Sequence, residues 1–164
     1  MSNSRLISGH KKDDNVIDFF MDIPFFDRIN SEEIKVISKH MATKSINKGD
    51  ILFNESDKGN YICFIVTGAL EVAVTKKQSN EKAVLAKLTR GQSIGEMAII
   101  ENLPRFATVS AVENSTMYIL SKSAFDLILT KHPHIGIKLL KGVSHILSNN
   151  LRQTSLKLAE FLES

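Results

Sequence analysis

A series of short apolar segments separated by turn residues constrains the fold of this chain more than any other feature. Between residues 42 and 121, the segments Ala69–Val74 and Val84–Leu88 have the composition of β-strands. Several short strands at this spacing indicate an antiparallel β-sandwich or barrel. The turns between strands are predicted at Asn47–Asp50, Asp57–Asn60, Thr67–Gly68 and Thr89–Gln92.

Helices are predicted before and after the strands. In residues 14–41, Pro24 interrupts the apolar pattern, so we expect two helices, the second starting with a capping box from Asn30 to Glu33. After the strands, Ser123 with Asp126 three residues later is expected to cap a helix that runs to about Lys131. Pro133 is expected to start a last helix that continues to the end of the chain.

The length of the chain fits one domain with one core. Its 164 residues, of which 43% are hydrophobic, are enough to bury about two thirds of the unfolded surface without disulfides or metals. The one cysteine, Cys63, lies in an apolar run and is predicted to be a small core residue in a reducing compartment. We expect a polar tail over 1–13 and a domain over 14–164, made of helices (14–41), a β-roll (42–121) and C-terminal helices (123–163).

Composition argues against several functional classes. No apolar run approaches the ~20 residues that span a bilayer, and the polar start lacks a signal-peptide core, so we expect a soluble cytoplasmic protein. The formal net charge of +3, with scattered lysines, implies neither nucleic acid nor a membrane as partner. The histidines predict no metal site because they lie in the tail and the helical regions, at His10, His40, His132, His134 and His145.

A glycine, a carboxylate and a guanidinium come close together after the strand-rich region. Gly95 precedes one apolar helical turn that starts at Glu96, and Arg105 follows after a proline loop. Free N–H groups at a helix start and an arginine fork bind phosphate oxygens, whereas an ionised glutamate accepts from hydroxyl groups. The segment therefore predicts a pocket for a sugar phosphate. An ordinary surface ion pair would contribute only ~0–1 kcal/mol and would leave the rest of the pattern unexplained.

The segment Gly95–Val109 resembles the phosphate-binding cassette of cyclic nucleotide-binding domains, G-E-[LMI]-[AGS]-L-x-P-R-[AST]-A-[TS]-V. This family includes bacterial catabolite activator proteins, regulatory subunits of protein kinase A and cyclic nucleotide-gated channels. The resemblance covers nearly the whole chain and implies an α+β fold, an antiparallel β jelly-roll barrel flanked by N-terminal helices and a long C-terminal helix pair. It implies binding of cyclic AMP or cyclic GMP, without catalytic residues or metal. The implied ligand-binding residues are Gly95, Glu96, Met97, Ala98, Arg105, Phe106, Ala107, Ile146, Asn149 and Asn150.

Two positions depart from the family pattern. Ser56 replaces a turn glycine, and we expect this change to lie away from the anion pocket. Phe106 stands where the family has Ala, Ser or Thr, and a hydroxyl there is associated with guanine recognition. Because Phe106 offers no hydroxyl, we expect cyclic AMP to be preferred over cyclic GMP. The alternatives are that Phe106 points into the barrel, or that its bulk weakens both ligands.

The last helix carries an apolar stripe over Ile135–Leu162. The stripe is as narrow as a coiled-coil seam, so we expect a homodimer through the second half of the helix, whereas Ile137–Val143 is expected to pack on the barrel of its own domain. The resemblance implies that Ile146, Asn149 and Asn150 close over the base of the ligand. Asn150 has the alternative role of a polar residue that sets the register of a dimer seam. The stripe consists of Leu140, Leu147, Leu151, Leu158 and Phe161.

These features favour a non-enzymatic, stand-alone cyclic nucleotide sensor that changes the position of its C-terminal helix and signals to an effector protein. A phosphodiesterase is disfavoured because no residues that could hold metals and an activated water are apparent. A DNA-reading helix pair would need tens of residues beyond Ser164. The alternatives are the ligand-binding part of a larger transcription factor, kinase or channel, and a structural dimerisation module with an empty pocket.

Overall fold

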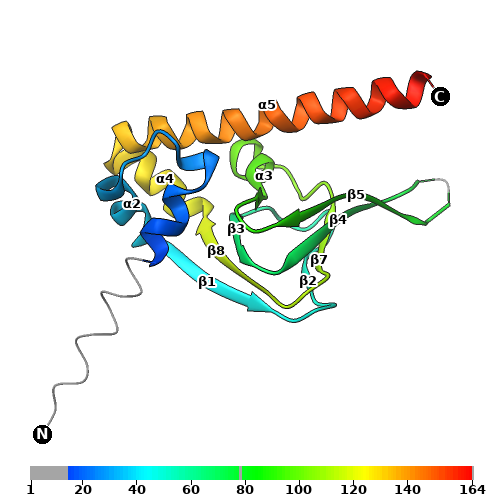
Figure 1. The fold of residues 1–164 in the computed structure, drawn as a ribbon, viewed down its shortest axis with the longest axis horizontal. Helices are drawn as coiled ribbons and strands as arrows, with labels where there is room; N and C mark the ends of the chain where they lie inside the picture. Colours follow the sequence, from blue (N-terminus) through cyan, green and yellow to red (C-terminus); the bar gives the residue numbers. More distant parts are fainter. Residues whose placement is uncertain (1–14, 78, 164) are drawn as a thin grey trace, which may run out of the picture.

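The chain folds into two antiparallel sheets, with most of the helices gathered at one end and the long last helix running from there past the strands (Figure 1). The computed structural model describes residues 15–77 and 79–163, so the predicted tail 1–13 lies outside the described residues. One sheet has the order β1-β8-β3-β6 and the other β2-β7-β4-β5. The strands are β1 (Met41–Ile46), β2 (Ile51–Phe53), β3 (Tyr61–Thr67), β4 (Ala69–Thr75), β5 (Lys82–Thr89), β6 (Ser93–Ile94), β7 (Thr108–Ala111) and β8 (Ser115–Ser121).

Antiparallel sheets flanked by helices are therefore confirmed. The ladders of the described residues form two separate sheets and do not close into one barrel. Between the sheets lies an apolar core to which both contribute, with Cys63 and Ile65 from one sheet and Leu70 and Val109 from the other. Cys63 is fully buried, as expected of a core residue, and burial raises the pKa of its thiol to about 12.

The helical end has an aromatic core of its own. It contains a helix over residues 15–21 and the elements η1 (Pro24–Phe26), α2 (Ser31–Ser38), α4 (Lys122–Lys131) and α5 (Pro133–Glu163). The ring of Phe64 on β3 lies 5.5 Å from Phe20 and 5.2 Å from Phe26, centroid to centroid. These edge-on and tilted ring contacts join the helices to the sheet that contains β3.

Three of the predicted helix starts can be compared with the structure, and α5 starts at Pro133 as expected. The capping box is confirmed, because Asn30 accepts from the Glu33 N–H and Glu33 accepts from the Asn30 N–H. The predicted cap at Ser123 is wrong: Ser121 is the N-cap of α4, and its hydroxyl accepts from Ala124 N–H at 3.1 Å. The extended backbone of β8 continues to Ser121, so the N-cap lies two residues earlier than the Ser123–Asp126 spacing indicates.

Helix α5 has a buried first half and an exposed second half. Ile135, Leu139 and Val143 join the aromatic core of the helical end, so this half packs on helices rather than on the β-strands, and Ile137 is 56% exposed. Every described residue from Ser148 onward is exposed, and Figure 1 shows α5 passing above the strands to the C-terminus. Within the described ranges, no helix has the length and apolar character needed to cross a membrane.

Two contacts fix the first half of α5. Lys138 Nζ lies 2.7 Å from both carboxylate oxygens of Glu33, which ties α5 to α2. Gly142 packs directly on the backbone of η1, since a Cβ at this position would lie 2.3 Å from the carbonyl oxygen of Phe25. The direction of α5 across the strands is therefore set at its N-terminal end.

Candidate functional site

The cassette segment begins with a glycine that no other residue replaces without strain. Helix α3 (Glu96–Glu101) follows β6 directly, and Gly95 between them has φ +102°. A Cβ on Gly95 would lie 2.5 Å from Arg105 Nη1 and 2.7 Å from the carbonyl oxygen of Tyr61. Both the left-handed backbone and the close approach of Arg105 therefore require glycine here.

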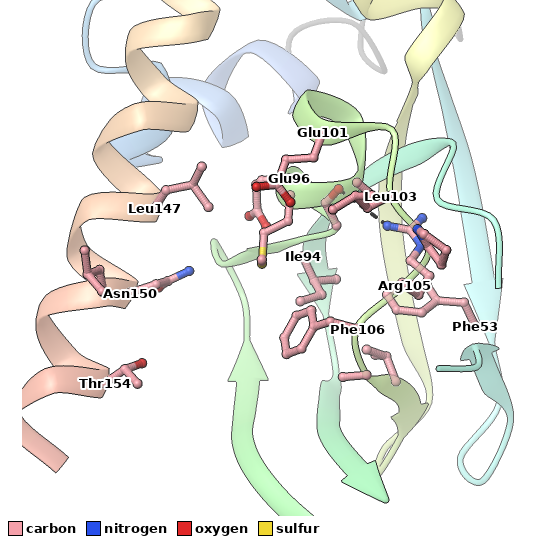
Figure 2. Close-up of a pocket in the computed structure, with 17 residues that line it drawn as sticks. Phe53, Ile94, Glu96, Glu101, Leu103, Arg105, Phe106, Leu147, Asn150 and Thr154 are labelled. Carbon is pink, nitrogen blue, oxygen red and sulfur yellow. Dashed lines mark hydrogen bonds between the residues drawn. The ribbon is translucent and has the colours of Figure 1, made fainter. Parts of the chain in front are cut away.

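A cavity of about 460 Å³ lies between α3, the following loop and α5. In Figure 2, Leu147, Asn150 and Thr154 of α5 lie on one side, across the cavity from Glu96 and Arg105. The remaining lining is mostly apolar and comes from Phe53, Ile94, Met97, Ala98, Leu103, Pro104, Phe106, Ala107, Val109 and Leu151, with Gly95 and Glu101. An apolar cavity with a few converging polar groups is typical of a small-molecule site.

Glu96 is almost fully buried, with 4% of its surface exposed. The hydroxyl of Ser93 donates a hydrogen bond to its Oε1 atom. Burial raises the pKa of the Glu96 carboxyl, while the Ser93 hydrogen bond, backbone N–H groups and the charge of Arg105 partly oppose this rise. The carboxylate is thus a hydrogen-bond acceptor held in a fixed orientation in a dry pocket wall.

Arg105 is equally buried, at 4% exposed. Its Nη2 donates to the carbonyl oxygen of Tyr61 at 2.8 Å and its Nη1 to that of Gly95 at 3.4 Å. The Nε atom is buried and has no hydrogen-bond partner among the described residues. Burial lowers the pKa of the Arg105 guanidinium, while the nearby side chains of Tyr61, Cys63 and Glu96 partly oppose this decrease. A buried cation with an unused donor is costly unless an anion joins it.

The backbone of Arg105 is held by the turn that contains Ser56. Ser56 N–H donates to the carbonyl oxygen of Arg105, and Arg105 N–H donates to that of Asp57, each at 2.8 Å. Ser56 adopts φ +72°, the left-handed conformation that the replaced glycine would adopt more easily. The expectation that this turn lies away from the anion pocket is therefore wrong, because its partner is the arginine itself.

The structure brings eight of the ten predicted residues around this cavity. The other two, Ile146 and Asn149, line an adjoining cavity of about 670 Å³ between α5 and β4–β5. Phe106 and Asn150 line both cavities, and Phe106 is 48% exposed. The alternative that Phe106 points into the β interior is therefore wrong, as is an ordinary surface ion pair between two residues as buried as Glu96 and Arg105.

Sequence reasoning missed the side chains that support the two charged groups. Phe53 and Tyr61 contact the guanidinium of Arg105, and Ser93 orients Glu96. Phe53 and Tyr61 come from β2 and β3, far from the cassette in sequence, so no local motif marks them. Thr154 of α5 also lines the cavity and was not among the predicted binding residues. In the described part of the chain, no group of three His, Cys, Asp or Glu side chains could hold a metal ion.

Comparison with known proteins places these features in a family. The family model "Cyclic nucleotide-binding domain" matches residues 43–132. A cAMP-dependent protein kinase regulatory subunit of Mycosarcoma maydis is 37% identical over 93 residues, covering 57% of this chain and 17% of that protein. A cGMP-dependent protein kinase of Plasmodium berghei is 33% identical over 101 residues, covering 62% of this chain and 11% of that protein. The matched part thus spans less than a fifth of the length of either relative.

A solved structure resembles the chain over most of its length. The crystal structure of a cyclic nucleotide-binding domain from Methylobacillus flagellatus superposes with a TM-score of 0.82 at 25% sequence identity. The superposition covers 92% of this chain and 84% of the bacterial domain. The similarity therefore includes the helices that flank the family match as well as the strands.

Proposed function

Because the chain belongs to the family of cyclic nucleotide-binding domains, we propose that it binds a 3′,5′-cyclic nucleotide and signals to a partner protein through helix α5. The observation that carries this proposal is Arg105, a buried guanidinium with an unused Nε donor beside a cavity of nucleotide size. A cyclic phosphate would supply the missing counter-charge.

Each part of the ligand has a matching part of the pocket. Arg105 and the N–H groups from Gly95 to Ala98, with those of Phe106 and Ala107, bind the cyclic phosphate. Glu96 accepts a hydrogen bond from a ribose hydroxyl. The base extends into the adjoining cavity, where Ile146, Asn149 and Asn150 of α5 face it across from Phe106.

Helix α5 is the element that transmits the signal in this proposal. Its residues line both cavities, so a bound base contacts α5 directly. A ligand that contacts α5 better in one position shifts the population toward that position by its differential affinity. The domain acts without catalysis, and its partner is a protein that recognises the position of α5.

Three further features complete the proposal. The way in which the eight strands alternate between two sheets supports a jelly roll. The buried thiol of Cys63 is consistent with a cytoplasmic protein. The exposed leucines of α5, Leu151 at 69% and Leu158 at 56%, support a parallel homodimer through the second half of this helix.

Cyclic AMP is expected to bind more tightly than cyclic GMP. Phe106 lines both cavities and presents a ring without a hydroxyl, so the exocyclic amine of a guanine base finds no partner at this position. Calorimetric titration of the wild type with both nucleotides, and of Phe106→Thr, tests this. We expect a preference of about 5–10-fold in the wild type that falls in the variant, as one hydrogen bond would give.

Phe106→Leu is the matched control because it keeps apolar bulk and also lacks a hydroxyl. It should keep the wild-type ratio, whereas Phe106→Thr should change it. A wild type that prefers cyclic GMP contradicts the selectivity, and equal ratios in all three proteins show that Phe106 does not choose the base. Failure of both nucleotides to bind the folded wild type contradicts the proposed function itself.

Ligand affinity is expected to fall as the pH is lowered. Burial raises the pKa of Glu96 above its ordinary value of 4.5, so this carboxylate takes up a proton at a higher pH than an exposed glutamate does. A neutral carboxyl accepts a ribose hydroxyl less strongly, which predicts about 5–10-fold weaker binding on the acid side of that pKa. Titrations between pH 7.5 and about 4.5 measure this dependence.

Glu96→Gln is the control for the pH dependence, because its amide oxygen accepts but does not titrate. Its affinity should be lower at neutral pH and nearly independent of pH. Unfolding caused by protonation of Glu96 does not explain a loss of affinity at low pH. Because the folded-state pKa is raised above 4.5, Glu96 stabilises the folded protein at low pH, and this contribution is lost as the pH rises. A wild-type affinity that does not change with pH contradicts the assigned role.

A further inference from the structure

The guanidinium of Arg105 contacts two aromatic rings that lie roughly at right angles to each other. Its Cζ atom is 4.0 Å from the ring centroid of Phe53 and 4.6 Å from that of Tyr61. The two rings are 6.2 Å apart and inclined by 71°. We call the corner formed by these two rings the aromatic slot. Cation–π attraction is stronger in such a dry site than at the surface, because water does not compete for the cation.

Both rings of the aromatic slot are themselves fixed. Phe53 belongs to the core between the two sheets and is buried. Tyr61 packs against the same core, and its hydroxyl donates to the carbonyl oxygen of Leu52 at 3.2 Å. The slot is therefore a rigid part of the strand framework, whereas an arginine side chain by itself has many rotamers.

The slot acts together with the two carbonyl oxygens described above. The carbonyl oxygens of Tyr61 and Gly95 accept one hydrogen bond each from the Nη atoms, and both rings contact the guanidinium. Rotation of the side chain is thus opposed by ring contacts and by hydrogen bonds. Without the rings, the guanidinium would be hydrated and mobile, and an incoming anion would have to displace that water and immobilise the chain.

We infer that Phe53 and Tyr61 are positioning residues, which hold Arg105 in the pocket wall and set its affinity for the anionic part of the ligand. This inference rests on the proposed cyclic nucleotide function. Its consequence is selective: loss of either ring weakens binding of the charged ligand much more than binding of a neutral ligand of similar shape. A residue that only fills the core would affect both ligands alike.

A second arginine serves as an internal control. Arg90 lies over the ring of Phe19, with its Cζ atom 5.0 Å from the ring centroid, and donates to the carbonyl oxygen of Val66 at 2.9 Å. Phe19 is buried in the aromatic core of the helical end, apart from the slot. Phe19→Leu therefore removes an aromatic ring from an arginine without touching Arg105.

The first experiment needs no ligand. In nitrogen-15 NMR spectra of the whole chain, the Nε–H signal of Arg105, assigned through Arg105→Lys, should be shifted upfield by the two rings and should exchange slowly with water. Phe53→Leu and Tyr61→Leu should move it downfield and speed its exchange. Tyr61→Phe, which keeps the ring, and Phe19→Leu should leave it unchanged. An Arg105 signal that is the same in both leucine variants overturns the inference.

The second experiment compares cyclic AMP with adenosine, which lacks the phosphate. Phe53→Leu and Tyr61→Leu should weaken cyclic AMP binding about 5–30-fold, as loss of a buried cation–π contact predicts, with a much smaller effect on adenosine affinity. Tyr61→Phe should restore cyclic AMP affinity. Equal weakening of both ligands in folded variants overturns the positioning role. If the wild type binds no cyclic nucleotide, the proposed function fails, and the NMR result still decides whether the rings hold Arg105.

Discussion

Replacing Arg105 by alanine is expected to reduce cyclic nucleotide affinity by about thirtyfold to several thousandfold, equivalent to ~2–5 kcal/mol. Arg105 is the positive group that the cavity wall presents beside Glu96, and its Nε donor has no partner among the described residues. Without it, the phosphate would leave water for a pocket whose remaining charged groups include the carboxylates of Glu96 and Glu101. Isothermal titration calorimetry with cyclic AMP measures the loss.

Arg105→Lys is the companion variant, since it keeps the charge but has no planar fork and cannot reach both carbonyl oxygens in the same way. It should bind more weakly than the wild type and more tightly than Arg105→Ala. Circular dichroism checks that each variant is folded. A folded Arg105→Ala protein with unchanged affinity would show that the phosphate does not bind at this residue.

The double variant Leu151→Lys with Leu158→Lys is expected to convert a dimer into a monomer. Both leucines are largely exposed on α5, seven residues apart along the apolar stripe that also contains Leu147. Facing leucines at this repeat bury each other in a parallel helix pair, whereas facing lysines repel and lose the apolar contact. Multi-angle light scattering of the wild type should give the mass of two chains, and of the variant the mass of one.

The pair Leu156→Lys with Ala159→Lys is the matched control. These residues lie on the same exposed half of α5 but outside the stripe, and the change in charge is the same. This control should remain dimeric, which separates loss of the seam from a general effect of positive charge. A wild type that is monomeric at high concentration contradicts the homodimer.

The cassette was the part of the site that the sequence could predict. Gly95, Glu96 and Arg105 lie within eleven consecutive residues, so one local segment indicates both their chemistry and the turn between them. The capping box at Asn30 and Glu33 was predictable for the same reason, because its hydrogen bonds span three residues. Ligand binding by these residues, the base preference and the homodimer remain predictions.

Features that depend on strand pairing were missed or misplaced. Phe53 and Tyr61 reach Arg105 because β2 ends, and β3 begins, beside this residue, and Ser56 was expected to lie away from a residue whose backbone it holds. The helix cap moved to Ser121 because β8 extends that far before α4 begins. The partners of Phe53, Tyr61 and Ser56 are distant in sequence, and β8 extends to Ser121 because this residue pairs with Tyr61 of β3, so the composition of one segment does not reveal these features.

The sequence by itself determined the type of chemistry, an anion and hydroxyl pocket built on one glycine, one glutamate and one arginine, together with the order of helices and strands. Only the tertiary structure decided which residues lie across the cavity from this glycine, glutamate and arginine. The direction of α5, set by Lys138 on Glu33 and by Gly142 on η1, places Asn150 at both cavities and leaves Ile146 and Asn149 at the second alone. Local residue patterns specify backbone geometry and nearby donors, whereas the long-range packing of helices and sheets specifies what lies across a cavity.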